Sequence, residues 1–224
     1  MIVRMACLPV LPALLIPVVL LSLGSDGQAV EPIHAASVPG LAVRDDGRTG
    51  VIHYIVIQIT TGVQSEGPVI QFSQINLGGG SLVGDDWKES IKQAVAAAIR
   101  QLGVDGRDWL VTIKNRSYNS VTDGASNSGA VAVGVMAAWR GDAMRSDVAM
   151  TGRITPDGNI VAVGNIPAKL EAAARERFKT VLVPRGQVHQ MDWDLSALAA
   201  KLHLTVLEVE TLEQAYQLMA GESR

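Results

Sequence analysis

An α/β domain is the fold class that this sequence predicts, and three observations lead to it. Hydrophobic residues make up 48% of the 224-residue chain and charged residues 18%, so the chain can bury a core of ordinary size. Residues 51–59 form a run rich in β-branched side chains, as strands do. In the second half of the chain, short strand-like runs alternate with helical segments, which is typical of α/β domains.

Local signals place the individual elements. Strands are predicted at residues 51–59, 69–72, 109–113, 147–150, 160–163, 180–184 and 205–209. Helices are predicted at residues 85–102, 126–138, 166–178, 195–201 and 212–219. The first helix opens with Asp85 and Asp86, which suit the positive end of a helix dipole, and Gly103 ends it. The second helix is apolar on every side beyond its first turn, which predicts a buried helix.

The segments between these elements are rich in Gly, Pro, Asn and Asp. Such residues mark turns and loops because they adopt turn conformations at low cost. Breaks are therefore predicted at residues 78–80, 115–119 and 156–159. Residues 30–49 contain scattered Pro and Gly, and we interpret them as a linker or a loosely packed arm before a folded domain at residues 50–224.

The first 29 residues have the pattern of a secretory signal peptide. Arg4 provides a positive charge, an apolar run follows over residues 6–23, and small residues lead to a cleavage point after Ala29. Three prolines interrupt this run, and it is short for the roughly 20 residues of a membrane-spanning helix. We predict export to the periplasm or the extracellular space, and a membrane anchor if the segment is not cleaved.

Charge and composition exclude several classes of function. The net charge is −3, which lacks the basic footprint of a nucleic-acid-binding protein. The single cysteine, Cys7, lies in the N-terminal segment, so the predicted domain has no thiolate metal site. The four histidines are scattered without metal-ligand spacing, and no phosphate-binding loop or Walker-type motif occurs. We therefore predict no metal or cofactor.

The start of the buried helix offers the one strong candidate for chemistry. Ser126 stands between a polar turn and the helix, where free N–H groups and a positive dipole stabilise a developing oxyanion. A serine hydroxyl needs a base, which can be a lysine whose pKa burial lowers toward neutrality. From the residues alone, a helix cap is the more common role for a serine in this place, and Ser128 is a second candidate nucleophile.

Four segments of the chain resemble the proteolytic domain of Lon proteases, the serine–lysine peptidases of family S16. The sequence Asp-Gly-Ala-Ser at residues 123–126 is similar to the family's Asp-Gly-Pro-Ser, with Ser126 at the nucleophile. Lys169, which follows Ser126 by 43 residues without a gap, falls on the family's catalytic lysine. The similar segments, in the family's order, are residues 122–129, 145–155, 158–170 and 178–184. The resemblance implies the fold of that domain, which contains a mixed sheet.

The resemblance also implies a role for each matched residue. Ser126 attacks the scissile carbonyl, and Lys169 removes its proton. Thr151 matches a threonine that hydrogen-bonds near the lysine, and Asp123 matches an acidic residue that shapes the active-site loop. The backbone around Gly124 and Ser126 supplies the oxyanion donors.

Several positions depart from the family pattern. The replaced positions are Ala125 for proline, Ser128 and Asn165 for glycine, Pro167 for lysine and Arg153 for glutamate. The segment 113–117 lacks the family's usual pattern before the nucleophile, so the resemblance does not extend to the substrate preference. Arg153 would lower the pKa of the lysine further if it lay close in space.

These observations predict a serine endopeptidase that cleaves unfolded or flexible polypeptides outside the cytoplasm, without ATP in this chain. The resemblance implies a homo-oligomer, such as a hexameric ring. The N-terminal segment adds an association with the membrane if it remains attached. The alternative is a catalytically idle binding or scaffold module with the same fold, as some relatives of the family are.

Overall fold

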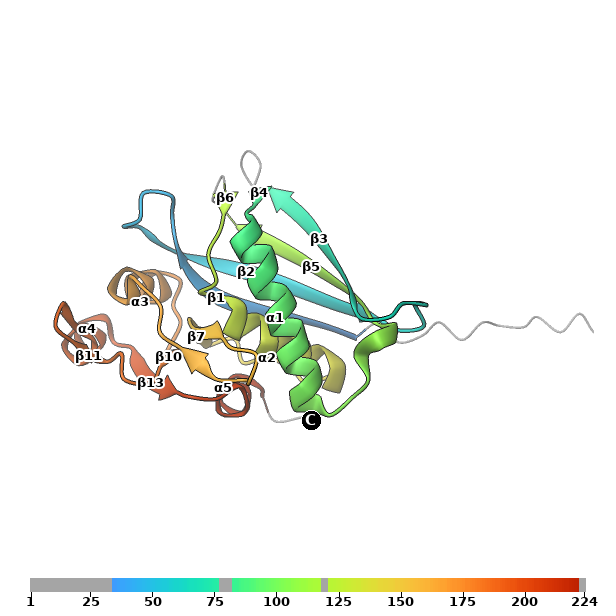
Figure 1. Ribbon diagram of the computed structural model, residues 1–224. Coiled ribbons are helices and arrows are strands. Elements are labelled where there is room, and N and C mark those ends of the chain that lie inside the picture. Colours follow the sequence, from blue (N-terminus) through green and yellow to red (C-terminus); the bar gives the residue numbers. More distant parts are fainter. Residues whose placement is uncertain (1–33, 77–81, 118–120, 222–224) are drawn as a thin grey trace, which may run out of the picture. The chain divides into compact units, whose positions relative to one another are not determined.

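The computed structural model describes residues 34–76, 82–117 and 121–221, and Figure 1 shows their arrangement. The five α-helices are α1 (Asp85–Leu102), α2 (Ser128–Arg140), α3 (Ile166–Arg175), α4 (Leu195–Leu202) and α5 (Leu212–Met219). The strands of the main sheet are β1 (His34–Val43), β2 (Gly50–Thr60), β3 (Val69–Asn76), β5 (Leu110–Ser117), β7 (Val148–Met150), β10 (Thr180–Pro184) and β13 (Thr205–Val209). The predicted α/β class with a mixed sheet is confirmed.

Shorter elements connect these. They are β4 (Leu82–Val83), the 3-10 helix η1 (Gly106–Asp108), β6 (Val121–Thr122), β8 (Arg153–Ile154), β9 (Ile160–Val161), β11 (His189–Gln190) and β12 (Trp193–Asp194). Two pairs of them adjoin segments that contain predicted site residues. β4 pairs with β6 just before residue 123, and β8 pairs with β9 just after residue 152.

The main sheet has the order β13-β10-β7-β1-β2-β5-β3, with β1 in its middle. β13, β10, β7 and β1 run parallel to one another, whereas β2 is antiparallel to both of its neighbours. The linker prediction for residues 30–49 is therefore wrong for His34–Val43, which forms β1. Val38 and Leu41 of this strand are fully buried, one on each face of the sheet.

Helices cover the sheet in two separate layers. One core cluster joins Ile55 and Ile57 of β2 to residues of α1, α2 and α5. The other joins Leu41 and Ile52 to residues of α3 and α4 on the opposite face. Side chains of a strand alternate between faces, so odd-numbered positions of β2 face α2 and even-numbered ones face α3.

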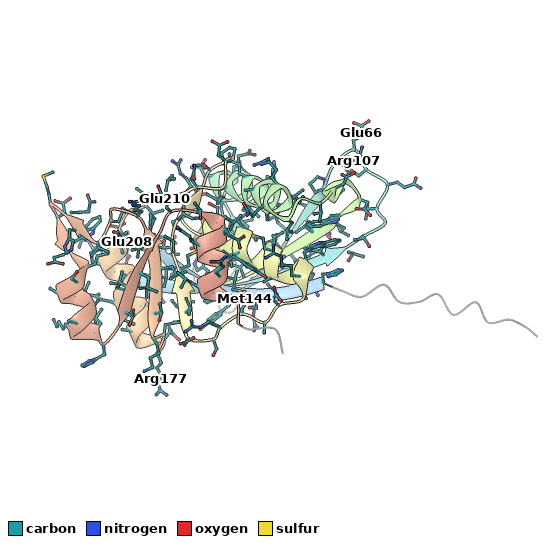
Figure 2. The ribbon with its side chains drawn as sticks, turned by 90° about the horizontal axis from the view of Figure 1, so that it is seen from below. Glu66, Arg107, Met144, Arg177, Glu208 and Glu210 are labelled. Carbon is teal, nitrogen blue, oxygen red and sulfur yellow. The ribbon has the colours of Figure 1, made fainter. Side chains whose placement is uncertain are left out.

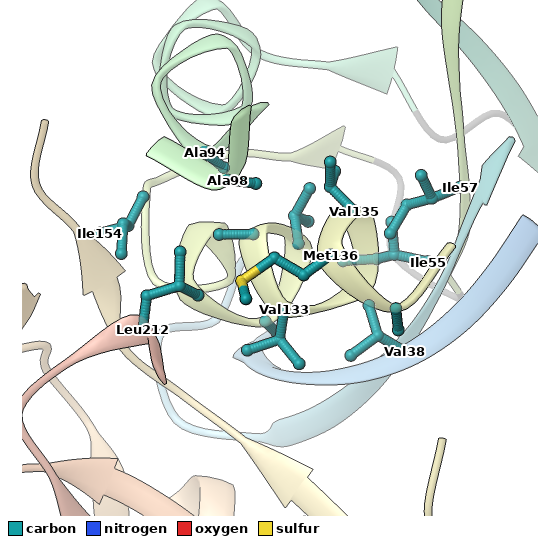
Figure 3. Packing of buried hydrophobic residues seen from close by; sticks show 14 of the residues in the cluster. Val38, Ile55, Ile57, Ala94, Ala98, Val133, Val135, Met136, Ile154 and Leu212 are labelled. Atoms are coloured by element: carbon teal, nitrogen blue, oxygen red, sulfur yellow. The ribbon is translucent and has the colours of Figure 1, made fainter. Parts of the chain in front are cut away.

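The prediction of a buried second helix is confirmed. All residues of α2 from Ser128 to Ala138 are buried. Figure 3 shows Val133, Val135 and Met136 of this helix among side chains of the sheet, such as Ile57, and of α1. A Cβ on Gly134 would lie 2.3 Å from Ile57 Cδ1, so glycine is required for this close approach of helix and sheet.

Some predicted boundaries differ from the structure. The segment 115–119 was expected to be a loop, but Asn115 to Ser117 continue β5, whose residues pair with β2 and β3. α3 ends at Arg175, earlier than expected, and Arg177 follows with a left-handed backbone. The glycine break at 78–80 and the N-terminal segment 1–29 lie outside the described residues. No helix within the described ranges is long and apolar enough to span a bilayer.

Candidate active site

Ser126 lies in a turn that leads into α2 and is partly buried. The helix begins at Ser128 with Asn127 as its N-cap, so Ser126 is neither the first helical residue nor the cap. Its carbonyl oxygen accepts hydrogen bonds from Gly152 N (2.8 Å) and from Thr151 Oγ1 (3.3 Å). The backbone of the candidate nucleophile is therefore fixed to the segment that follows β7.

Ser128, the second candidate nucleophile, has a structural role. Its Oγ donates to Ala125 O at 2.8 Å and accepts from Ile154 N at 3.0 Å. These two bonds close the turn around Ser126 and attach β8 to it. A hydroxyl that is 1% exposed and already bonded on both sides is poorly placed for attack on a substrate.

Lys169 projects from α3 and is only 2% exposed. Its Nζ donates a hydrogen bond to Thr151 Oγ1 at 3.0 Å. Burial lowers the pKa of the Lys169 ammonium from 10.5 to about 8, because desolvation disfavours the charged form. Arg153 is exposed and is not among the causes of this shift, so the expected influence of its charge is not found.

Two departures from the family pattern fit the start of α3. Asn165 is the N-cap and adopts a left-handed backbone with φ 56°, which asparagine tolerates better than most residues other than glycine. Pro167 lies in the first turn, where its missing N–H would have no helical partner. Both replacements therefore preserve the helix that carries Lys169.

Thr151 links the two candidate groups. It is fully buried, it accepts the Lys169 hydrogen bond, and its own hydroxyl donates to Ser126 O. Lys169 is thus two hydrogen bonds from the backbone of Ser126, although the chain places them 43 residues apart. Among the described residues, Ser126 Oγ and Lys169 Nζ form no direct hydrogen bond. Such bonds in sites without substrate are often long and tighten when substrate binds.

Asp123 attaches the nucleophile turn to α1. Its Oδ1 accepts from Trp87 N at 3.1 Å, and Trp87 is the third residue of that helix. Gly84 makes this approach possible, because a Cβ there would lie 2.3 Å from Asp123 Cγ. Gly124 follows with φ 81°, a left-handed conformation that lets the chain turn sharply toward Ser126.

Two further residues of this region, His53 and Asn127, are not among the predicted site residues. Both are buried, and Asn127 Nδ2 lies 3.3 Å from His53 Nδ1. In the sheet His53 pairs with Gly40, and a Cβ on Gly40 would lie 2.9 Å from Asn127 Cγ. The signal for His53 was its position as a titratable residue inside an apolar strand, but nothing in the sequence indicated its partner.

Burial and the nearby charge of Lys169 lower the pKa of His53 from 6.5 to about 4. His53 does not in turn lower the pKa of Lys169, because His53 is already neutral at the pH where the lysine titrates. His53 is therefore a neutral neighbour of the candidate base. In the described part of the chain, no three His, Cys, Asp or Glu side chains are grouped as metal ligands would be.

Most of this chain matches a known protein family. The profile of the Lon protease (S16) C-terminal proteolytic domain matches residues 71–220, well over half of the chain. The archaeal Lon protease of Methanocaldococcus jannaschii is 30% identical over 160 residues, which are 66% of this chain and 23% of that protein.

Two further relatives give the same result. The Lon protease of Haemophilus influenzae is 34% identical over 145 residues, 60% of this chain and 17% of that protein. The archaeal Lon protease of Thermococcus kodakarensis is 26% identical over 181 residues, 81% of this chain and 27% of that protein. This chain therefore spans about a quarter or less of the relatives that it matches. The chain belongs to the family of Lon protease C-terminal proteolytic domains.

Proposed function

We propose that this chain is a serine endopeptidase in which Ser126 is the nucleophile and Lys169 the general base. The observation that carries the proposal is the buried hydrogen-bonded path from Lys169 through Thr151 to the backbone of Ser126. It supports a lysine that is desolvated, held in one orientation and close to a serine turn at the start of a buried helix. Family membership supports the same reaction class.

The chemistry proceeds in two steps. Neutral Lys169 removes the Ser126 hydroxyl proton while Oγ attacks the scissile carbonyl carbon, and the tetrahedral oxyanion then expels the amine, which receives the proton from the lysine. In the second step, Lys169 removes a proton from water, the resulting hydroxide attacks the acyl-enzyme, and the proton returns to Ser126 Oγ. Thr151 positions the amine throughout.

Backbone donors for the oxyanion are at hand beside Ser126. The Ser126 N–H makes no backbone hydrogen bond to any residue that the structure describes, and it precedes the positive end of α2. Such a free donor, aimed at a developing negative charge, is the usual means of stabilising an acyl-transfer transition state.

The test is cleavage of an unfolded substrate such as casein, without ATP. We expect wild-type protein to degrade casein, and Ser126→Ala and Lys169→Ala to be inactive because each removes a reacting group. Lys201→Ala is the matched control, since Lys201 is an exposed lysine on another helix and its loss should leave activity unchanged. Equal activity in all four proteins would reject the dyad. Folded wild-type protein that binds casein without cleaving it would favour the idle binding module.

The pH dependence of activity gives an independent check. Because Lys169 must be neutral to act, kcat/KM should rise about tenfold per pH unit below a midpoint near pH 8 and level off above it. The measurement is kcat/KM for a fluorogenic peptide from about pH 6 to about pH 10. Arg153→Gln should leave the midpoint unmoved, because desolvation alone lowers this pKa. A rate that is constant over the range would contradict lysine as the base.

We also propose where the protein acts and how it assembles. The N-terminal pattern of residues 1–29 supports action outside the cytoplasm, where unfolded polypeptides would be the substrates. Assembly of several copies into a ring is proposed from family membership, and light scattering of the purified protein tests it.

A further inference from the structure

A pocket of about 540 Å³ lies where α3 ends beside the first half of β2. Three arginines from three different elements surround it: Arg44 just after β1, Arg116 on β5 and Arg175 at the end of α3. Ile52 and Tyr54 of β2 contribute to its wall. Both are even-numbered positions of β2, so the pocket opens on the face of the sheet that carries α3.

The charges around this pocket are unbalanced. Arg44 and Arg116 form no ion pair with any described residue, although the charge of Arg44 contributes to lowering the pKa of Asp46. Arg175 donates to Gly50 O at 2.7 Å. Glu176 is the carboxylate in the lining, so the walls carry an excess of two positive charges. The whole chain has a net charge of −3, so this concentration of guanidinium groups does not reflect a generally basic surface.

The pocket is related to the candidate base through α3. Arg175 stands six residues after Lys169 on this helix, about 9 Å along its axis. An extended peptide advances about 3.3 Å per residue, so this rise corresponds to roughly three residues of a substrate whose cleaved bond lies beside Lys169.

We infer that this arginine-lined pocket is a substrate subsite for an acidic side chain of the polypeptide. The inference rests on the proposed function and deepens it by naming a substrate class. Guanidinium groups bind carboxylates through paired hydrogen bonds in a fixed geometry, and a volume of about 540 Å³ has room for an acidic side chain. A flat membrane surface or a nucleic-acid backbone would instead need a broad basic face, which the net negative charge does not favour.

The test uses Ser126→Ala protein, which binds peptides without cutting them. Two dye-labelled peptides are compared, identical except that glutamates in one are glutamines in the other. We expect the glutamate peptide to bind at least about tenfold more tightly at low ionic strength. Arg44→Gln with Arg116→Gln should abolish this preference. The matched control, Arg100→Gln with Arg107→Gln, removes the same charge elsewhere; Arg107 lies at the end of the molecule that carries Glu66 (Figure 2).

Other outcomes overturn the inference. Equal binding of the two peptides, or a preference that survives Arg44→Gln with Arg116→Gln, would exclude an acidic subsite here. Competition by inorganic phosphate or acetate as strong as that of the glutamate peptide would assign the pocket to a small anion. Tighter binding to anionic lipid vesicles would assign it to a membrane. If wild-type protein binds with the expected preference but cleaves neither peptide, the proposed function fails while the acidic-peptide pocket stands.

Discussion

Lys169→Met should produce a protein that is more stable than the wild type and at least about a thousandfold less active. The loss of activity follows because the substitution removes the proposed base for the Ser126 proton. The gain in stability follows because a buried ammonium is replaced by an apolar chain of similar length. A pKa lowered from 10.5 to about 8 means that the folded state disfavours the charged lysine by about 3 kcal/mol at neutral pH.

The net gain should be smaller than this figure. Methionine removes the hydrogen bond to Thr151, whose hydroxyl keeps its bond to Ser126 O, and such a bond contributes about 1 kcal/mol. The free energy of unfolding should therefore rise by about 2 kcal/mol. Urea denaturation at neutral pH measures it, with Lys201→Met, an exposed position, as the control that should change little.

The gain in stability from Lys169→Met should depend on pH, because the charge of the buried lysine does. Between about pH 8 and pH 10.5 the unfolded lysine holds a proton that the folded one lacks, so wild-type stability rises with pH through this window. Lys169→Met lacks this rise, and its advantage should disappear above it. A lower free energy of unfolding in Lys169→Met than in the wild type would show that burial of the charged lysine does not destabilise the folded state.

Gly50→Ala should have the second largest effect, through the packing of α3 on the sheet. A Cβ at Gly50 would lie 1.9 Å from Ala168 O, a backbone atom that cannot rotate away. Helix and strand must separate, and Ala168 is the residue before Lys169. We expect a loss of about 1–3 kcal/mol in stability and a fall in kcat larger than the change in KM, because the base moves away from Ser126.

Thermal unfolding and peptide hydrolysis measure these changes. The matched control is Gly67→Ala, since a Cβ at Gly67 meets nothing within 4 Å and its φ is not in the left-handed region. Wild-type activity in Gly50→Ala would mean that the position of Lys169 does not depend on this contact.

Much of the fold could be predicted because local patterns coincide with the tertiary structure. The apolar run at 51–59 became the buried strand β2, and the helix apolar on all sides became the central helix α2. β1 was missed because Pro39 and Gly40 suggest a turn. Although β1 lies in the middle of the sheet, β7 pairs with it only at Gly40, so the β7 side of β1 makes few ladder hydrogen bonds and tolerates a proline that has no N–H.

Only those parts of the candidate site that lie within segments resembling the family could be predicted from the sequence. Ser126, Lys169 and Thr151 lie within segments that resemble the family, and the structure brings their neighbourhoods together. His53 and Asn127 are 74 residues apart, and their contact depends on the space beside Gly40. No local pattern encodes a contact of this kind, so only the folded chain reveals it.

The two layers of helices contribute one group each to the proposed dyad. Ser126 precedes α2 on one face of the sheet, and Lys169 comes from α3 on the other. A newly made chain on which just one layer has docked would hold a hydroxyl without its amine, or the reverse. On the proposed chemistry such an intermediate is inert, so the molecule could hydrolyse a peptide only after both helix layers have packed on the sheet.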